Sequence, residues 1–296
     1  MFACRLAPVV LALVMTSAVA DDVPRTLRVY HVGNSVTDTI RYTALAELAK
    51  ARGHRHVWGR HMIPGAPLAW LWDHPAQGFQ QPPFGHYPKA LADYEWDALT
   101  LQPFDRQLDK GDDNDLKLCR RFIDLARKRS PDVQVYVYSR WPRRDEPAKG
   151  TYRLDYAKKW ERKYTGGWDG TNETRDYFER LVAALRKAYP DAKKPVLLIP
   201  VGDVLLELDR RAKAGKVPGL DGAEKLYADG IHFNDVGAYV VGCTFFATLY
   251  RETPVGLPAA PYKVSDEKLA RAIQETVWQV VRTHPLAGVK NDKADR

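Results

Sequence analysis

The sequence predicts an α/β protein built on a doubly wound parallel sheet. Short segments rich in β-branched and aromatic residues alternate along the chain with longer segments whose apolar residues recur at helical spacing. This alternation needs crossover connections, and it favours parallel strands with helices packed on both faces. In such folds ligands bind beyond the carboxyl ends of the strands, where several small and polar residues of this chain fall.

Four segments have the composition of buried or half-buried strands, and a fifth is weaker. Their residues are mainly Val, Leu, Ile, Tyr and Thr. The four strong segments are 27–32, 97–102, 133–138 and 196–201, and the weaker one is centred on 56–58. Together they predict a central five-stranded parallel sheet.

Amphipathic segments predict the helices that connect and cover these strands. They lie at 39–52, 116–129, 177–188, 234–250 and 266–282. Asn234 is a plausible N-cap for the fourth of them. A linker rich in proline and alanine at 253–262 precedes the last helix, and a charged tail follows Gly288. We therefore expect one α/β domain at 21–255, with residues 256–296 packed on it or extending from it.

The first twenty residues have the pattern of a secretory signal peptide. Arg5 precedes an apolar run from Leu6 to Met15, and the segment ends in Ala18-Val19-Ala20, which suits cleavage after Ala20. No later segment has the roughly 20 consecutive apolar residues of a membrane-spanning helix. The expected localisation is secreted or periplasmic, without stable membrane insertion.

The net charge indicates which binding partners to expect, and the cysteine content indicates whether disulfides form. The formal net charge of +8 is modest, and it falls by one when Arg5 leaves with the signal peptide. In an exported protein such a surface favours anionic polysaccharide or lipid headgroups, and no nucleic-acid-binding motif is present. Cys119 and Cys243 have apolar neighbours, so we expect buried free thiols, with a single disulfide as the alternative.

Two short motifs carry the chemistry. Gly33-Asn34-Ser35 directly follows the first strand, and Asp229-Gly230-Ile231-His232 directly precedes the fourth helix. A serine hydroxyl becomes a useful nucleophile when an imidazole takes its proton and a third group orients that imidazole. Ser35, His232 and Asp229 are the residue types required, and the spacing of the last two allows both to face one serine.

These motifs, in this order, resemble the first and last conserved blocks of the SGNH (GDSL-like) hydrolase superfamily. The resemblance spans residues 27–250 and is strongest for a branch that acts on carbohydrates. It implies a flavodoxin-like three-layer α/β/α sandwich and ester hydrolysis through an acyl-enzyme, with no cofactor. It also implies that Ser35 is the nucleophile, His232 the base and Asp229 the residue that orients the base.

The chain departs from the pattern of that superfamily at two positions and matches it at a third. Asn34 replaces the usual aspartate of the first block, Gly65 is the best match to the glycine of the second, and Gln102 stands where the third has asparagine. Ester attack needs hydrogen-bond donors for the developing oxyanion. The expected donors are the backbone N–H groups of Ser35 and Gly65 and the side-chain amide of Gln102, although Gln102 could equally be a structural amide.

Metal binding is the less favoured interpretation of two polar clusters. His54, His56 and His61 lie close in sequence but among arginines, and a zinc site needs a further matched ligand. The acidic run at 112–115 lacks the ligand spacing of a calcium loop. We therefore predict no metal site.

The substrate is inferred from the residues expected around the serine. The segment 140–176 combines aromatic and basic side chains, which can stack on sugar rings and pair with acidic groups. Asn34, Trp70, Arg140 and Trp141 are the predicted substrate contacts. The predicted function is a secreted serine esterase that removes a small acyl group, most simply acetyl, from a carbohydrate, which could be anionic. A lysophospholipase or other carboxylester hydrolase, and a non-catalytic glycan-binding relative, are the alternatives.

Overall fold

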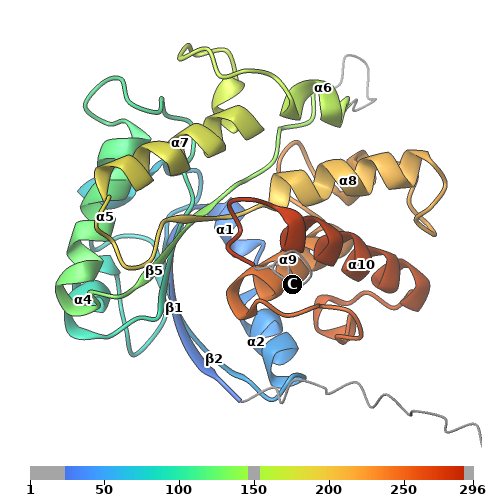
Figure 1. The fold of residues 1–296 in the computed structure, drawn as a ribbon, viewed down its shortest axis with the longest axis horizontal. Helices are drawn as coiled ribbons and strands as arrows, with labels where there is room; N and C mark the ends of the chain where they lie inside the picture. The colour runs from blue at the N-terminus through green and yellow to red at the C-terminus, as the bar shows by residue number, and fades with distance from the viewer. Residues whose placement is uncertain (1–23, 146–153, 290–296) are drawn as a thin grey trace, which may run out of the picture.

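A six-stranded sheet forms the middle layer of the protein (Figure 1). The computed structural model describes residues 24–145 and 154–289, and the predicted signal peptide and the last seven residues lie outside this part. The strands are β1 (Thr26–Gly33), β2 (Arg55–Met62), β3 (Phe79–Gln80), β4 (Ala98–Leu101), β5 (Gln134–Tyr138) and β6 (Leu197–Ile199).

The strand order is β3-β2-β1-β4-β5-β6, and every pair except β2 with β3 is parallel. The five parallel strands thus follow the doubly wound order 2-1-3-4-5, in which ligands bind where the winding reverses, beside the first strand. The predicted class and the five parallel strands are confirmed. The strand count is corrected by one, because β3 is a two-residue antiparallel edge strand, too short to leave a pattern in the sequence.

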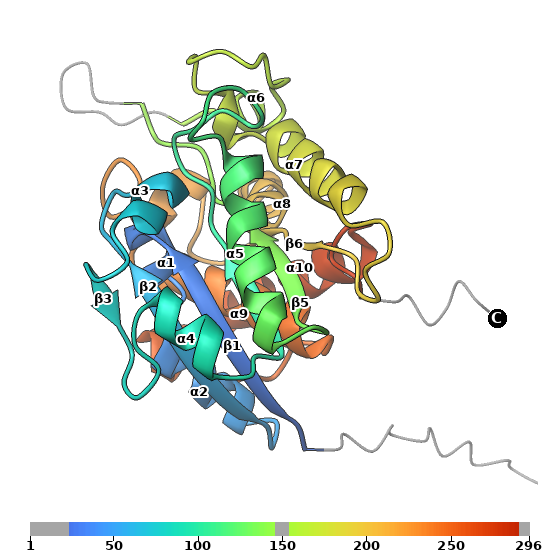
Figure 2. The same cartoon turned by 90° about the vertical axis from the view of Figure 1, so that its left-hand side faces the viewer.

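Helices cover both faces of the sheet and complete a three-layer sandwich (Figures 1 and 2). One face carries α3 (Leu68–Asp73), α4 (Tyr87–Asp93), α5 (Asp115–Arg129) and α7 (Arg175–Ala188). The other carries α2 (Tyr42–Lys50), α8 (Val201–Lys213), α9 (Asp235–Tyr250) and α10 (Glu267–Thr283). Short helices α1 (Ser35–Asp38), α6 (Tyr156–Trp160), η1 (Thr171–Glu173), η2 (Ala223–Leu226) and η3 (Ala260–Tyr262) lie in the connections.

Helix α9 is buried along nearly its whole length between the sheet and helices α2, α8 and α10. Asn234 is its N-cap, since the Asn234 side chain accepts a 3.0 Å hydrogen bond from the Gly237 backbone N–H. The cap fixes where the helix starts, and the predicted Asp229–His232 motif ends two residues before it. The position of this motif is therefore set by a packed core helix.

The C-terminal segment packs on the same core. Helix α10 lies against α8 and α9, and beyond it the Leu286 carbonyl oxygen accepts a 2.9 Å hydrogen bond from Leu198 of β6. Cys119 in α5 and Cys243 in α9 are buried free thiols on opposite faces of the sheet, as expected. Among residues 24–145 and 154–289, no helix has the length and apolar character needed to cross a bilayer.

Candidate active site

Ser35 lies at the carboxyl end of β1, where the chain turns abruptly into α1. Gly33 makes this turn possible, because a Cβ atom there would lie 2.0 Å from Thr37 Oγ1 and 2.9 Å from Gln102 Cβ. The next residue, Asn34, is the N-cap of α1, and its Oδ1 accepts a 3.0 Å hydrogen bond from Val36. Ser35 is thus held as the first residue of a capped helical turn.

The side chains of Ser35, His232 and Asp229 form a continuous hydrogen-bonded chain. His232 Nε2 lies 2.9 Å from Ser35 Oγ, and His232 Nδ1 lies 2.8 Å from Asp229 Oδ2. Ser35 is separated from His232 by 197 residues in sequence, so the fold itself brings them together. With Nδ1–H donating to the carboxylate, Nε2 is free to accept the serine proton.

The Asp229 carboxylate is held in its charged form. Partial burial raises the pKa of this carboxyl, but hydrogen bonds from the backbone of Ile231 (2.8 Å) and His232 (2.7 Å) and from the His232 ring outweigh it. The net result is a pKa of about 2 for Asp229. One oxygen therefore orders the loop while the other orients the imidazole.

The loop that carries Asp229 and His232 is fastened from one side by Arg144. Its guanidinium donates hydrogen bonds of 2.9 and 2.6 Å from Nε and Nη2 to the Asp229 carbonyl oxygen. The backbone N–H of Arg144 donates a further 2.9 Å bond to the Gly230 carbonyl oxygen. The segment after β5 therefore fixes the acid–histidine loop, a role that only the folded chain reveals.

Gly65 faces the same site from the loop between β2 and α3. Its φ of +68° is in the left-handed region that glycine adopts without strain, and its Cα faces open space. The Asn34 side chain donates a 3.1 Å hydrogen bond to the Ala66 carbonyl oxygen and so ties this loop to the serine turn. Within the described residues the backbone N–H groups of Ser35 and Gly65 have no acceptor, as groups that await an oxyanion would.

Gln102 does not present its amide group to this site. Its Nε2 donates a 2.6 Å hydrogen bond to the Pro103 carbonyl oxygen, and its Oε1 accepts hydrogen bonds from the Thr37 hydroxyl (3.2 Å) and the Asn34 backbone (3.5 Å). The side chain is buried below the serine turn. This corrects the expected oxyanion role, because the donor is used elsewhere, and it favours the structural alternative.

A hollow of about 480 Å³ opens beside the serine and histidine. Apolar atoms of Pro64, Phe104 and Ile231 form part of its wall, and Arg143 and Arg144 form another part. Ser35, Gly65 and His232 also line it. The hollow therefore brings a candidate nucleophile, a candidate base and two candidate oxyanion donors to one small, partly apolar space.

Two predicted substrate contacts are buried behind the site. Arg140 is 0% exposed and forms ion pairs with Asp105 and Glu173, and Trp141 is also 0% exposed. Asn34, the third, is used as the cap and loop tie described above. All three are corrected from substrate contacts to supporting residues, because each side chain is buried and hydrogen-bonded to other parts of the protein.

The aromatic segment after β5 is likewise mostly core. Trp141, Tyr156, Trp160 and Tyr164 are buried, and only Trp168 is largely exposed, while Tyr152 lies outside the described residues. The predicted extended aromatic surface is therefore wrong for these four side chains, which pack between helices instead. Trp70 in α3, the fourth predicted contact, is half-exposed and stacks on His74 at 3.8 Å.

The histidines near β2 have partners within the protein. His54 lies 3.0 Å from the Glu252 carboxylate, His56 lies 2.9 Å from the Tyr250 hydroxyl, and His61 accepts a 3.4 Å hydrogen bond from the backbone of Tyr87. In the part of the chain that the structure describes, no group of three or more His, Cys, Asp or Glu side chains is placed to hold a metal ion.

Comparison with solved structures gives the fold class. A DUF4886 family protein from Bacteroides uniformis superposes with a TM-score of 0.59 at 18% identity, over 87% of this chain and 95% of that one. This similarity concerns the fold alone. No family model matches the chain, and no curated protein matches it by sequence.

Looser matches include structures described as a carbohydrate esterase and a lipase/acylhydrolase. A carbohydrate esterase family 3 structure from Talaromyces cellulolyticus matches at 13% identity and a TM-score of 0.44, covering 81% of this chain and 100% of that one. A lipase/acylhydrolase from Enterococcus faecalis matches at 15% and 0.40, covering 79% and 98%.

Proposed function

We propose that this protein is a secreted serine esterase that hydrolyses a small O-acyl ester, most simply an acetyl ester, on a carbohydrate. The observation that carries the proposal is the hydrogen-bonded chain from Asp229 through His232 to Ser35, at the sheet edge where doubly wound folds bind ligands. Ser35 and Gly65 both line this hollow, and their backbone N–H groups have no acceptor among the described residues, so both groups are proposed oxyanion donors.

The geometry supports an acyl-enzyme mechanism. Ser35 Oγ attacks the ester carbonyl carbon while His232 Nε2 takes the hydroxyl proton, and the charged Asp229 carboxylate stabilises the imidazolium. The carbonyl oxygen becomes an oxyanion within reach of the Ser35 and Gly65 N–H groups. When the carbonyl reforms, the C–O bond to the sugar breaks and His232 returns the proton to the leaving sugar oxygen. Water then repeats the sequence and releases the free acid and Ser35.

The hollow supports a small acyl group. Its volume of about 480 Å³ is shared between the ester and the start of the leaving group, and Pro64, Phe104 and Ile231 are the apolar groups available to an acyl chain. Arg143 lines the hollow with a side chain 45% exposed, although it also pairs with Asp105. These features favour a short acyl chain on a polar alcohol over a long lipid chain.

The carbohydrate part of the proposal depends on fewer residues than the sequence implied. Of the predicted stacking aromatics in the described residues, Trp70 and Trp168 remain exposed. Trp70 follows Gly65 by five residues, and its half-exposed ring is the proposed stacking surface for a sugar. Export through a signal peptide cleaved after Ala20 is part of the proposal, and N-terminal sequencing of the exported protein tests it.

The function is tested with p-nitrophenyl acetate, butyrate and octanoate, using the purified protein and its Ser35→Ala variant side by side. We expect turnover that depends on Ser35 and falls from acetate to octanoate. Serine-dependent activity would then justify a screen of acetylated oligosaccharides for released acetate.

Other outcomes would replace the proposal. A preference for octanoate would favour the lysophospholipase or general carboxylester hydrolase alternative. Equal rates for wild type and Ser35→Ala would remove the esterase assignment and favour the non-catalytic glycan-binding alternative, for which saturable glycan binding unaffected by Ser35→Ala is the signature.

A further inference from the structure

The turn that carries Ser35 lies between two loops that follow the strands on either side of β1. Strands β2 and β4 both pair with β1 in parallel, so all three carboxyl ends lie at one edge of the sheet. Hydrogen bonds to β1 continue past the strand ends, from the Ile63 N–H at 3.3 Å on the β2 side and from the Gln102 N–H at 3.0 Å on the β4 side. The loop that carries Gly65 therefore lies on one side of Ser35, and the loop that carries Phe104 lies on the other.

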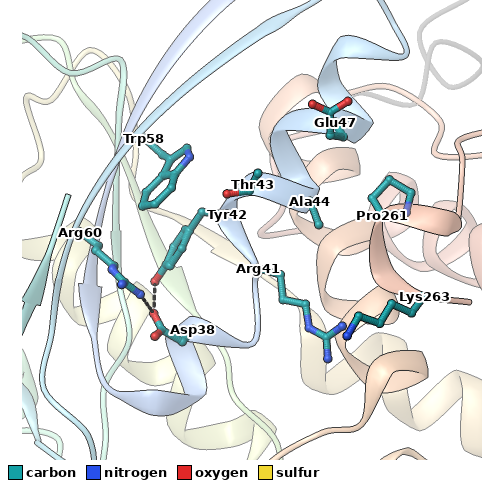
Figure 3. A pocket seen from close by; sticks show the side chains of 10 residues that line it. All are labelled: Asp38, Arg41, Tyr42, Thr43, Ala44, Glu47, Trp58, Arg60, Pro261 and Lys263. Atoms are coloured by element: carbon teal, nitrogen blue, oxygen red, sulfur yellow. Dashed lines mark hydrogen bonds and ion pairs between the residues drawn. The ribbon is translucent and has the colours of Figure 1, made fainter. Parts of the chain in front are cut away.

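Helix α1, which begins at Ser35, is held at both of its ends. Figure 3 shows its last residue, Asp38, in the wall of a separate pocket beside α2. The Asp38 carboxylate accepts hydrogen bonds from Arg60 Nη1 of β2 (2.6 Å) and from the Tyr42 hydroxyl of α2 (3.0 Å). The Asn34 cap fixes the start of the helix. The direction in which Ser35 Oγ attacks is therefore fixed relative to the two flanking loops.

The direction of the acyl group follows from the groups that surround the attacked carbon. In the acyl-enzyme mechanism proposed above, the oxyanion lies beside the N–H groups of Ser35 and Gly65, on the β2 side. The leaving oxygen lies beside His232 Nε2, which returns the proton to it. The acyl chain is the remaining substituent, and it points away from both groups, toward the β4 side. Phe104 is the residue of the loop after β4 that lines the hollow.

Phe104 is packed firmly into the wall of the hollow. The residue is only 8% exposed, and the guanidinium carbons of Arg140 and Arg143 lie 4.6 and 5.2 Å from its ring centroid. The next residue, Asp105, forms ion pairs with these two arginines at 3.0 and 2.6 Å, and Arg140 also pairs with Glu173. The ring could move aside only if these paired groups moved as well, because packed interiors leave little free space.

We propose that Phe104 is a specificity-determining residue of this site, whose ring closes the acyl side of the hollow and restricts the substrate to esters of short acyl groups. The inference rests on the proposed esterase function and deepens it by naming the residue that sets the acyl length. In this arrangement the methyl group of an acetyl ester contacts the ring of Phe104. A chain of eight carbons meets the ring before its ester carbon reaches Ser35 Oγ.

The test compares kcat/KM for p-nitrophenyl octanoate with kcat/KM for p-nitrophenyl acetate in wild type and in Phe104→Ala. The two esters share one leaving group, so the ratio reports the acyl group alone, and misfolded protein lowers both rates without changing the ratio. We expect an octanoate-to-acetate ratio well below one in wild type and an increase of about tenfold or more in Phe104→Ala. Phe104→Leu keeps an apolar side chain of intermediate size and should give a smaller increase.

Phe84→Ala is the matched control. Phe84 is a partly buried phenylalanine that packs edge-on against Tyr94 and Trp96, and it does not line the hollow. We expect this variant to keep the wild-type ratio. An unchanged ratio in Phe104→Ala, an equal increase in Phe84→Ala, or a wild-type ratio of one or more would each overturn this inference, while turnover that depends on Ser35 would leave the esterase in place. Turnover that does not depend on Ser35 would remove the esterase and this inference together.

Discussion

The indole Nε1 of Trp141 donates a 2.7 Å hydrogen bond to the carbonyl oxygen of Ile231, the residue before His232. The same indole stacks on Phe233, the residue after His232, with a centroid distance of 3.8 Å and an angle of 14°. One buried tryptophan therefore contacts both chain neighbours of the candidate base. It positions the imidazole from behind, while Arg144 fixes the other end of the loop.

Asp229→Asn tests the orienting carboxylate. The asparagine oxygen can still accept the hydrogen bonds from Ile231 and His232 that order the loop, so we expect normal folding. The lost charge no longer stabilises the imidazolium, and kcat should fall on the order of 10³- to 10⁴-fold. His232→Ala should cost more, because it removes the base itself. Steady-state rates with p-nitrophenyl acetate check this order, and an Asp229→Asn enzyme as fast as wild type would contradict it.

Gly65→Ala tests the oxyanion loop. A side chain at a φ of +68° costs about 1–2 kcal/mol, and relief of that strain should move the Gly65 N–H. We expect kcat to fall roughly tenfold to a hundredfold, with little change in KM. Gly53→Ala is the matched control, because Gly53 also has a left-handed φ, of +76°, and open space around it, but lies at the far end of β2. Equal effects of the two substitutions on kcat would argue against a donor at Gly65.

Arg144→Ala tests the fastening of the acid–histidine loop. It removes two hydrogen bonds to the Asp229 carbonyl oxygen, so we expect a loss of about 1–3 kcal/mol in the free energy of unfolding. The imidazole should also lose its fixed position, which lowers kcat about tenfold or more. Arg144→Lys keeps the charge without the two-pronged contact and should recover only part of the rate. Denaturant titration and steady-state kinetics separate the two effects, and a stability loss with unchanged kcat would limit Arg144 to a structural role.

Asp115→Asn tests a buried carboxyl at the start of α5. Burial raises the pKa of Asp115 to about 7, against the lowering effect of the Tyr177 hydrogen bond and of Arg140. The carboxyl of an aspartate in an unfolded chain has a pKa of about 3.9. Between about pH 4 and pH 7, Asp115 therefore holds its proton in the folded state and has lost it in the unfolded state. The contribution of Asp115 to stability is therefore present below about pH 4 and is lost as the pH rises through 7.

Asparagine is neutral at every pH and can accept the hydrogen bond from Tyr177. We therefore expect Asp115→Asn to stabilise the protein more at pH 8 than at pH 5, relative to wild type at the same pH. Chemical denaturation at the two pH values measures this difference. A difference of zero would mean that Asp115 titrates normally in the folded protein.

Local patterns in the sequence were enough to predict the five parallel strands and most of the long helices. Segments 27–32 and 133–138 are strongly apolar and become β1 and β5, and the predicted cap Asn234 starts α9. Strand β3 left no such signal, because two residues cannot establish an alternation. Helix α1 is likewise too short to be predicted from a pattern. It is a single turn, and it forms because Gly33 lies close to Thr37 and Gln102 and because Asn34 caps it.

Aromatic and charged residues were harder to interpret from sequence. Arg140 and Trp141 follow a strand at the substrate edge, as contact residues would, yet both are buried. Composition cannot separate an arginine that faces solvent from one that pairs with Asp105 and Glu173, which lie 35 and 33 residues away in the chain. Gln102 poses the same problem. The hydrogen-bond partner of its side-chain amide depends on the path of the chain beyond β4, which local patterns do not predict.

The sequence by itself determined the fold class and the five parallel strands, because these depend on local periodicity. It also singled out Ser35, His232 and Asp229 as candidate site residues, because of their side-chain chemistry. Only the tertiary structure decided which neighbours support them. It placed Trp141 and Arg144 against the loop that carries Asp229 and His232, and it turned the Gln102 amide away from the site. The physical reason is that hydrogen bonds, burial and charge pairing depend on distances between residues far apart in the chain, which no local pattern encodes.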